Sequence, residues 1–337
     1  MRPVTSVDWP AVIVFAVASV ALSWLVALPL WLRGQGLTDP LLAPTAAGMM
    51  FTPALATVAA LLVQRRTQGR RGARAVLREL GMWPLRPAGR TVGMTAAMIV
   101  AAPLLIFLGI AVLALTGLIT LDLVEFSGFA AAIRESVPAS TPLPPAGFLV
   151  TMQLVLIPVG ALINIPFAFG EELGWRGWLV PALRPLGVWP ALVISGAFWG
   201  FWHAPLILLG YNFAEPNPLG VLLMMVACVF FGILLGWTRL RTGSVWPAVL
   251  AHGAFNAAAG AIGLVIAADS PFPSLTVAGP LGMVMWGVFV AVILVLWGAG
   301  QFRPDRVAAS LGPDPVRRAP APQPSAPQPS APSVDPS

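Results

Sequence analysis

Two adjacent glutamates, followed by an arginine four residues later, are the strongest candidates for chemistry in this chain. Glu171 and Glu172 belong to only 13 acidic residues among 337, and apolar stretches flank them. Glu172 and Arg176 share a face of a helix, which favours an ion pair between them. Glu171 points about 100° away from that pair. The spacing predicts a structural role for Glu172 and leaves Glu171 free for chemistry, with a solvated helix start as the alternative.

The chain has two histidines, His203 and His252, and both fall within apolar stretches. A single histidine in a membrane span commonly makes only a hydrogen bond to a neighbouring helix. Two of them, with no histidine elsewhere, favour a shared site. His252 and Asn256 are four residues apart, so a helix presents an imidazole and a carboxamide on one face. A polar clamp between helices is the structural alternative for this pair.

Composition indicates that membrane helices must position these residues. Hydrophobic residues make up 58% of the chain and charged residues 9%, whereas a soluble domain carries about 25% charged residues. Apolar runs of about 18 residues or more predict spans. We therefore expect an all-α, polytopic membrane helix bundle with about eight transmembrane helices. Their approximate limits are residues 10–32, 46–64, 93–118, 147–169, 188–209, 219–237, 245–267 and 279–300.

The basic residues predict the orientation of the bundle. All 19 are arginines, and residues 65–92 form the most basic link. The positive-inside rule makes that link cytoplasmic. An even number of spans then places both termini in the cytoplasm, with every arginine except Arg33 and Arg134 on that side. Arginines beside apolar spans favour anionic lipid headgroups, so no nucleic-acid partner is expected.

Changes along the chain suggest four parts. Residues 1–144 hold the first three spans and the basic cytoplasmic loop 65–92, and residues 145–265 hold all candidate site residues. Residues 266–302 hold the last span. Residues 303–337 are rich in proline and lack an apolar period, which predicts a disordered tail.

Three local features refine this plan. Residues 73–80 are amphipathic and are expected to lie along the inner headgroups. Residues 119–146 are expected to form an outer loop. Pro205 is expected to end or kink the fifth span early.

The candidate residues must also reach one depth in the membrane. Counting helix rise places His252 about 10 Å from the cytoplasmic end and His203 deeper, while Glu171 lies at the edge. These residues meet only if the fourth helix continues past the glutamates and bends near Pro158 or Pro166.

Together the motifs resemble those of the CPBP family of intramembrane proteases, which includes CAAX prenyl endopeptidases and lysostaphin-resistance-like proteins. The matching motifs are Glu171-Glu172-Leu-Gly-Trp-Arg176, an aromatic residue four before His203, and His252-Gly-Ala-Phe-Asn256. The resemblance covers roughly residues 145–265. Trp199 stands where the family usually has phenylalanine; because a ring is kept, little effect is expected.

The resemblance implies an endopeptidase that uses a glutamate-activated water. By position, the family roles are a general base at Glu171, support from Glu172 and Arg176, a second-motif histidine at His203, and an oxyanion pair at His252 and Asn256. No cofactor is expected, since asparagine is a poor zinc ligand and suits an oxyanion site. Zinc held by Glu171, His203 and His252 is the alternative.

The resemblance further implies a multi-pass protein of the plasma membrane, cutting near its cytoplasmic face. Expected partners are the bilayer and a peptide or membrane-protein substrate, lipidated or not. Two other functions stay open on the same residues. One is a proton-coupled transporter with a carboxylate–histidine relay, and the other is a non-catalytic scaffold or immunity protein.

Overall fold

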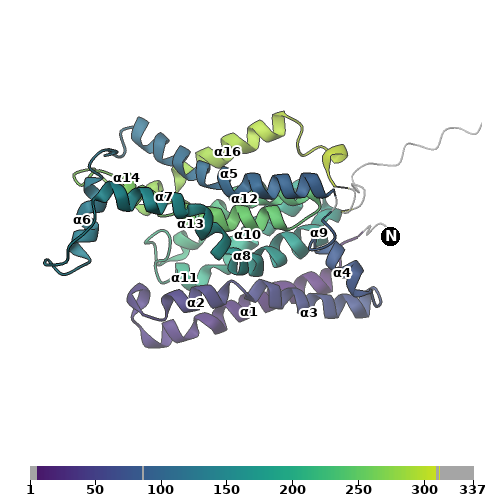
Figure 1. The fold of residues 1–337 in the computed structure, drawn as a ribbon. Coiled ribbons are helices and arrows are strands. Elements are labelled where there is room, and N and C mark those ends of the chain that lie inside the picture. Colours follow the sequence, from purple (N-terminus) through teal and green to yellow (C-terminus); the bar gives the residue numbers. More distant parts are fainter. Residues whose placement is uncertain (1–5, 86, 309–310, 312–337) are drawn as a thin grey trace, which may run out of the picture.

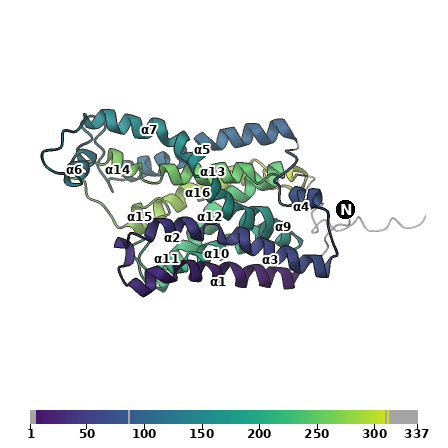
Figure 2. The same ribbon diagram turned by 60° about the horizontal axis from the view of Figure 1, so that its bottom comes forward.

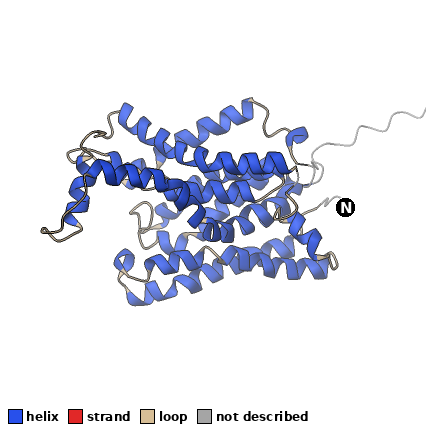
Figure 3. Cartoon of the chain, in the orientation of Figure 1, coloured by secondary structure: helices blue, strands red, loops and turns tan. Residues whose placement is uncertain are grey.

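The chain folds into a bundle of α-helices (Figure 3). The computed structural model describes residues 6–85, 87–308 and 311. Extended pairing in these residues is limited to one isolated bridge, between Leu121 and Ile266. The predicted all-α class is therefore confirmed, and most of the proline-rich tail lies outside the described residues.

Seven segments of the described chain are long and apolar enough to cross a membrane. They are α1 (Trp9–Arg33), α2 with α3 (Leu42–Met49 and Thr52–Thr67), α5 (Ala88–Leu115), α7 (Ala146–Ile163), α12 (Pro218–Thr242), α13 with α14 (Trp246–Ala258 and Ile262–Val265), and α15 with α16 (Leu275–Ala278 and Met283–Gly298). The protein is thus an integral, multi-pass membrane protein.

The span expected over residues 188–209 is shorter than predicted. It consists of α10 (Val188–Trp202), a break at His203, and α11 (Ala204–Ile207). Pro205 lies in the first turn of α11. Its ring nitrogen has no hydrogen to donate to the preceding turn, so the helix cannot continue unbroken. The predicted interruption by this proline is confirmed.

The remaining elements are short. They are α4 (Ala73–Glu79), α6 (Ser127–Glu135), α8 (Ile165–Glu172), a π-helix (Leu173–Leu179), α9 (Val180–Leu183), and 3₁₀ turns at Gly36–Thr38, Arg184–Leu186 and Pro304–Arg306. The helix α4 matches the amphipathic segment predicted at residues 73–80.

The outer segment predicted as a loop, residues 119–146, contains the helix α6. The carboxylate of Asp122 accepts backbone N–H bonds from Val124, Glu125 and Ser127 just before this helix. Hydrogen bonds from Ser127 and these amides hold the pKa of Asp122 well below its usual range. The ionised carboxylate therefore organises the start of α6, which the apolar-run criterion did not detect.

The bundle has a central group of helices between two outer layers. In Figures 1 and 2, α1 and α3 lie on one side of α10 and α12, and α5 lies on the other. Two thirds (67%) of the most apolar window of α12 is buried, and the same share of that of α13, against 28% for α1. The central helices are therefore the ones shielded from lipid on most of their surface.

Glycines allow the central helices α10 and α12 to approach closely. A methyl group added at Gly196 of α10 would lie 2.7 Å from the Cα atom of Val229. The same construction at Gly232 of α12 reaches within 3.3 Å of the Gly196 Cα atom. Small residues at helix crossings permit such contact between backbones. This contact fixes the position of the C-terminal half of α10, which carries Trp199 and is followed by His203.

The basic segments gather at one end of the bundle. Arg90 donates to the carbonyl of Arg241 (3.4 Å), and Arg241 donates to the carbonyl of Arg306 (2.6 Å). Figure 1 places α4 at this end and α6 at the opposite end. This arrangement agrees with the grouping of arginines predicted from the sequence.

The first residues of the predicted tail are packed against this end. The amide of Ala308 donates to the carbonyl of Leu240 at 2.7 Å, and the side chain of Phe302 is buried. The tail expected to be disordered from residue 303 therefore begins with a docked segment that includes the turn at Pro304–Arg306. Its later residues, 309–310 and 312–337, lie outside the described part.

Candidate active site

A break between two helices brings the glutamates into the bundle. The helix α7 ends at Ile163, whereas the fourth span was predicted to reach residue 169. The next helix, α8, starts with Pro166 in its first turn, and a proline there cannot extend the preceding helix. Glu171 and Glu172 are 2% and 0% exposed. The alternative of a solvated helix start is therefore wrong. The break before Pro166 lies at one of the two prolines where a bend was expected.

Two glycines let α8 and the π-helix lie directly on the α2–α3 junction. A methyl group at Gly170 would lie 2.6 Å from the carbonyl oxygen of Met50. One at Gly174 would lie 2.6 Å from the Cβ atom of Pro53. Larger residues at either position would push the glutamates away from the centre of the bundle.

Glu172 lies at the centre of a buried cluster of hydrogen-bonded side chains. Its Oε1 atom accepts hydrogen bonds from Arg176 Nη1 (2.9 Å) and from His252 Nδ1 (3.0 Å). All three side chains are at most 6% exposed. The predicted pairing of Glu172 with Arg176 is confirmed, and His252 is a second partner that spacing did not reveal.

Glu171 is held from a different helix. The indole Nε1–H of Trp199 donates to Glu171 Oε2 at 2.6 Å. The guanidinium carbon of Arg176 lies 4.2 Å from the centre of the Trp199 ring, within the range of a cation–π interaction. The sequence predicted only a retained aromatic ring at Trp199. The contact with Glu171 was missed, although a buried indole N–H generally needs an acceptor.

His203 lies at the break between α10 and α11. Its Nδ1 atom is 2.8 Å from the carbonyl oxygen of Trp199, and a carbonyl only accepts, so Nδ1 carries the proton. The Nε2 atom of a neutral His203 is then an acceptor. The rings of His203 and His252 both lie near the Trp199 ring, with centroids 5.9 Å and 5.4 Å from its centroid.

Asn256 lies one helical turn beyond His252 on α13 and is exposed. Its carboxamide makes no hydrogen bond to another described residue. The structure thus brings together Glu171, Glu172, Arg176, Trp199 and the two histidines, and leaves Asn256 at the rim of this cluster.

A buried arginine fixes the far side of the π-helix. Arg239 of α12 is 0% exposed; its Nε atom donates to the carbonyl of Arg176 (3.0 Å), and Nη2 donates to the carbonyl of Glu79 (2.6 Å). One guanidinium therefore joins α12, the π-helix and α4 through main-chain oxygens.

The part of the chain that holds this cluster is similar to a known protein family. Residues 151–258, from α7 to the end of α13, match the family described as type II CAAX prenyl endopeptidase Rce1-like. All six residues singled out in the sequence fall within these limits. We call residues 151–258 the CPBP segment, because they are similar to this family. The CAAX prenyl protease 2 of Methanococcus maripaludis is 29% identical over 106 residues.

The match with that protein is partial. It covers 30% of this chain and 39% of the length of the relative. The CPBP segment contains the whole buried cluster described above, whereas α1 to α5, α15 and α16 lie outside the matched residues.

The positions of the three residues of the zinc alternative bear on whether they could hold one ion. This alternative requires Glu171, His203 and His252 on one ion. In the part of the chain that the structure describes, no three His, Cys, Asp or Glu side chains are grouped so that they could hold a metal. The Nδ1 atom of each histidine is already hydrogen-bonded, which leaves only Nε2 of each ring for another partner.

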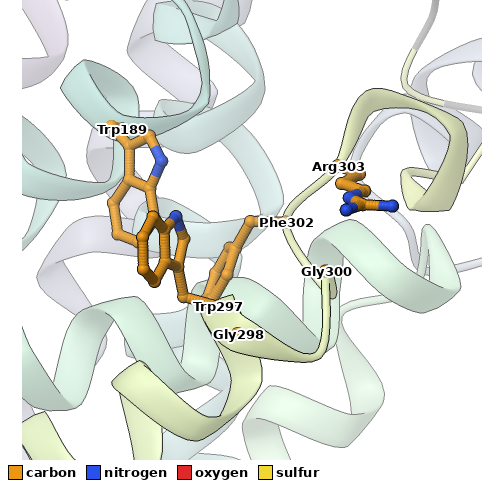
Figure 4. Close-up of a pocket in the computed structure, with 6 residues that line it drawn as sticks. All are labelled: Trp189, Trp297, Gly298, Gly300, Phe302 and Arg303. Carbon is orange, nitrogen blue, oxygen red and sulfur yellow. The ribbon is translucent and has the colours of Figure 1, made fainter.

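A separate cavity of about 380 Å³ lies at the end of α16 (Figure 4). Its lining residues are Trp189, Trp297, Gly298, Gly300, Phe302 and Arg303. None of them belongs to the buried cluster around Glu171 and Glu172, so this cavity is distinct from the candidate active site.

Proposed function

We propose that this protein is an intramembrane endopeptidase in which Glu171 activates a water molecule for attack on a peptide bond. The observation that carries the proposal is the different state of the two neighbouring carboxylates. Glu172 Oε1 accepts hydrogen bonds from Arg176 and His252, and its Oε2 is fully enclosed without a hydrogen-bond partner among the described residues. Glu171 uses only Oε2, for Trp199. Its Oε1 is thus the oxygen that can meet a water.

The proposed reaction follows from these contacts. Glu171 Oε1 takes a proton from water as the hydroxyl oxygen bonds to the substrate carbonyl carbon, and it returns the proton to the leaving amine when the C–N bond breaks. The proton count is balanced, because the carboxylate ends as it began.

Two donors on α13 support the oxyanion in this proposal. The Nδ1 atom of His252 is occupied by Glu172, so an imidazolium at this position presents Nε2–H to the substrate. The carboxamide of Asn256 supplies the second donor from the rim. With His252 protonated, the cluster contains two carboxylates and two cations and is neutral overall. Fixed donors at a developing oxyanion commonly provide a large share of catalysis.

The neighbours of the site suggest the finer points. His203, with Nε2 as acceptor, orients the attacking water. No metal takes part. The substrate is a peptide or membrane protein, cut near the cytoplasmic face of the plasma membrane. Because the Methanococcus relative is named a CAAX prenyl protease, a prenylated C-terminal peptide is the first substrate to try, beside the same peptide without the lipid.

The test uses the purified full chain in proteoliposomes with both peptides. Glu171→Gln is expected to lower kcat between about 100- and 10,000-fold, as loss of a general base does. Glu79→Gln makes the same chemical change outside the site and is the control. Cleavage that survives Glu171→Gln would remove Glu171 from the proposed role. Inhibition by a zinc chelator, reversed by added zinc, would replace the metal-free mechanism by the zinc one.

The same vesicles test the transporter alternative. A pH-sensitive dye inside them reports proton entry. Proton flux that depends on Glu171, without cleavage of either peptide by the wild-type chain, would overturn the peptidase proposal.

A further inference from the structure

Trp199 occupies the centre of the site without any role assigned to it in the proposed reaction. It is 3% exposed and lies on α10, one turn before His203. Its ring is in contact distance of both histidines, and the Arg176 guanidinium covers its face at 4.2 Å. The indole Nε1–H of this ring donates a hydrogen bond to Glu171 Oε2 at 2.6 Å.

That hydrogen bond depends on indole chemistry. A phenylalanine at position 199 would keep an aromatic face for Arg176 but would have no N–H to donate. A bond from a neutral donor to a carboxylate is stronger than one between neutral groups. In an apolar bundle it is also the one direct hydrogen bond that the carboxylate of Glu171 receives from the described residues.

We propose that Trp199 is a positioning residue for Glu171: its indole N–H holds Oε2 and so directs Oε1 toward the attacking water while keeping the carboxylate ionised. This inference rests on the proposed function for the choice of Oε1 as the reacting oxygen. It goes beyond that function because it assigns the orientation and the charge state of the base to a residue on another helix. Two constraints act together on Trp199, since Arg176 fixes the ring plane and the Gly196 contact fixes the helix.

The expected consequence has a defined sign. A donor that binds the ionised form favours that form, so its removal lets the carboxylate take up a proton at higher pH. A hydrogen bond to a charged group is strong enough to move such a midpoint by about one pH unit. Trp199→Phe should therefore shift the acid limb of the kcat/KM profile upward by about one unit, with little change in KM.

Trp178→Phe is the matched control. The Nε1–H of Trp178 is also buried, but it donates to Gln64 Oε1 at 3.3 Å, away from the cluster. It should leave the acid limb in place, even if it lowers thermal stability. A purely structural role of Trp199 would reduce the plateau rate and the unfolding temperature without moving the limb.

A second measurement does not depend on cleavage. Difference infrared titration follows the carboxyl C=O band that disappears in Glu171→Gln, and in Trp199→Phe its midpoint should rise by the same amount as the acid limb. If Trp199→Phe does not fold, benzothienylalanine at position 199 replaces only the N–H by sulfur and should give the same shift.

The outcomes separate this inference from the proposed function. An unchanged midpoint and an unchanged acid limb, in an enzyme that Glu171→Gln inactivates, would overturn the role of Trp199 alone. Full cleavage by Glu171→Gln would overturn the proposed function, while the infrared midpoint would still decide whether Trp199 stabilises the ionised Glu171.

Discussion

At the scale of single residues, Glu171 and Glu172 show how neighbours of the same type acquire different properties. They are adjacent in sequence and both buried. Glu172 accepts hydrogen bonds from a guanidinium and an imidazole, whereas Glu171 accepts one from an indole N–H. A buried ion pair contributes little net stability compared with an apolar core, but the protein is strongly destabilised when one of the two charges is removed. The difference predicts separate consequences for removing each charge.

Glu172→Gln is expected to destabilise the protein by about 3–5 kcal/mol, because Arg176 would keep a buried charge without its carboxylate. The measurement is thermal unfolding in detergent, followed by circular dichroism. Glu79→Gln is the control, since the pair of Glu79 with Arg71 is partly exposed and such pairs contribute about 1 kcal/mol or less. Equal losses in the two variants would contradict the anchoring role of Glu172.

Sequence spacing predicted only the local contact of this cluster. The Glu172–Arg176 pair spans one helical turn and follows from helix geometry. The contacts from Trp199 to Glu171 and from His252 to Glu172 join residues 28 and 80 positions apart. They depend on how three helices cross, which no local pattern encodes. For the same reason, the sequence predicts little effect of a tryptophan in place of phenylalanine at position 199.

At the scale of elements, the region from α7 to α9 departs most from the prediction. Hydropathy indicated one span over residues 147–169, but the chain contains α7, a break, α8 and a π-helix. A π-helical turn holds more residues than an α-helical one and is often found at functional sites. Apolar composition reports the length of a hydrophobic run; it does not report the break at Pro166 or the wider turn that follows.

Two glycine-to-alanine substitutions are expected to change the stability in opposite directions, because only one of the glycines lies at the contact between α10 and α12. Gly196→Ala should destabilise the protein by about 1–3 kcal/mol, because the added methyl group meets the α12 backbone and overpacking has this cost. Gly287→Ala on α16 has open space around it and should stabilise by up to about 1 kcal/mol through helix propensity. Unfolding temperatures of both variants in the same detergent test this. Stabilisation by both would show that α10 and α12 can separate without strain.

At the scale of the whole molecule, hydrophobicity and the arginine pattern predicted most of the architecture. Seven spans, the shorter α10 and the clustering of basic links at one end follow from terms that act over whole segments. The side of the membrane on which that end lies is a separate property, and the positive-inside rule predicts the cytoplasm.

Single cysteines test this orientation directly. Cys228 is 1% exposed and is the one cysteine of the chain, so the parent protein should react little with a membrane-impermeant maleimide. Glu135→Cys, on α6, should label in intact cells, while Arg70→Cys, beside α4, should label only after the membrane is opened. The reverse pattern would invert the bundle and move the proposed site to the outer face.

The buried guanidinium of Arg239 determines which positions around it can tolerate substitution. Both of its acceptors are main-chain carbonyls, those of Arg176 and Glu79, and every amino acid offers the same oxygen. The side chains of α4 can therefore change without loosening the joint between α4 and the π-helix. Arg239 itself has no such freedom, because lysine carries one compact ammonium group in place of a planar fork. The contact between Arg239 and α4 therefore tolerates substitution of the side chains on α4 but not of the arginine.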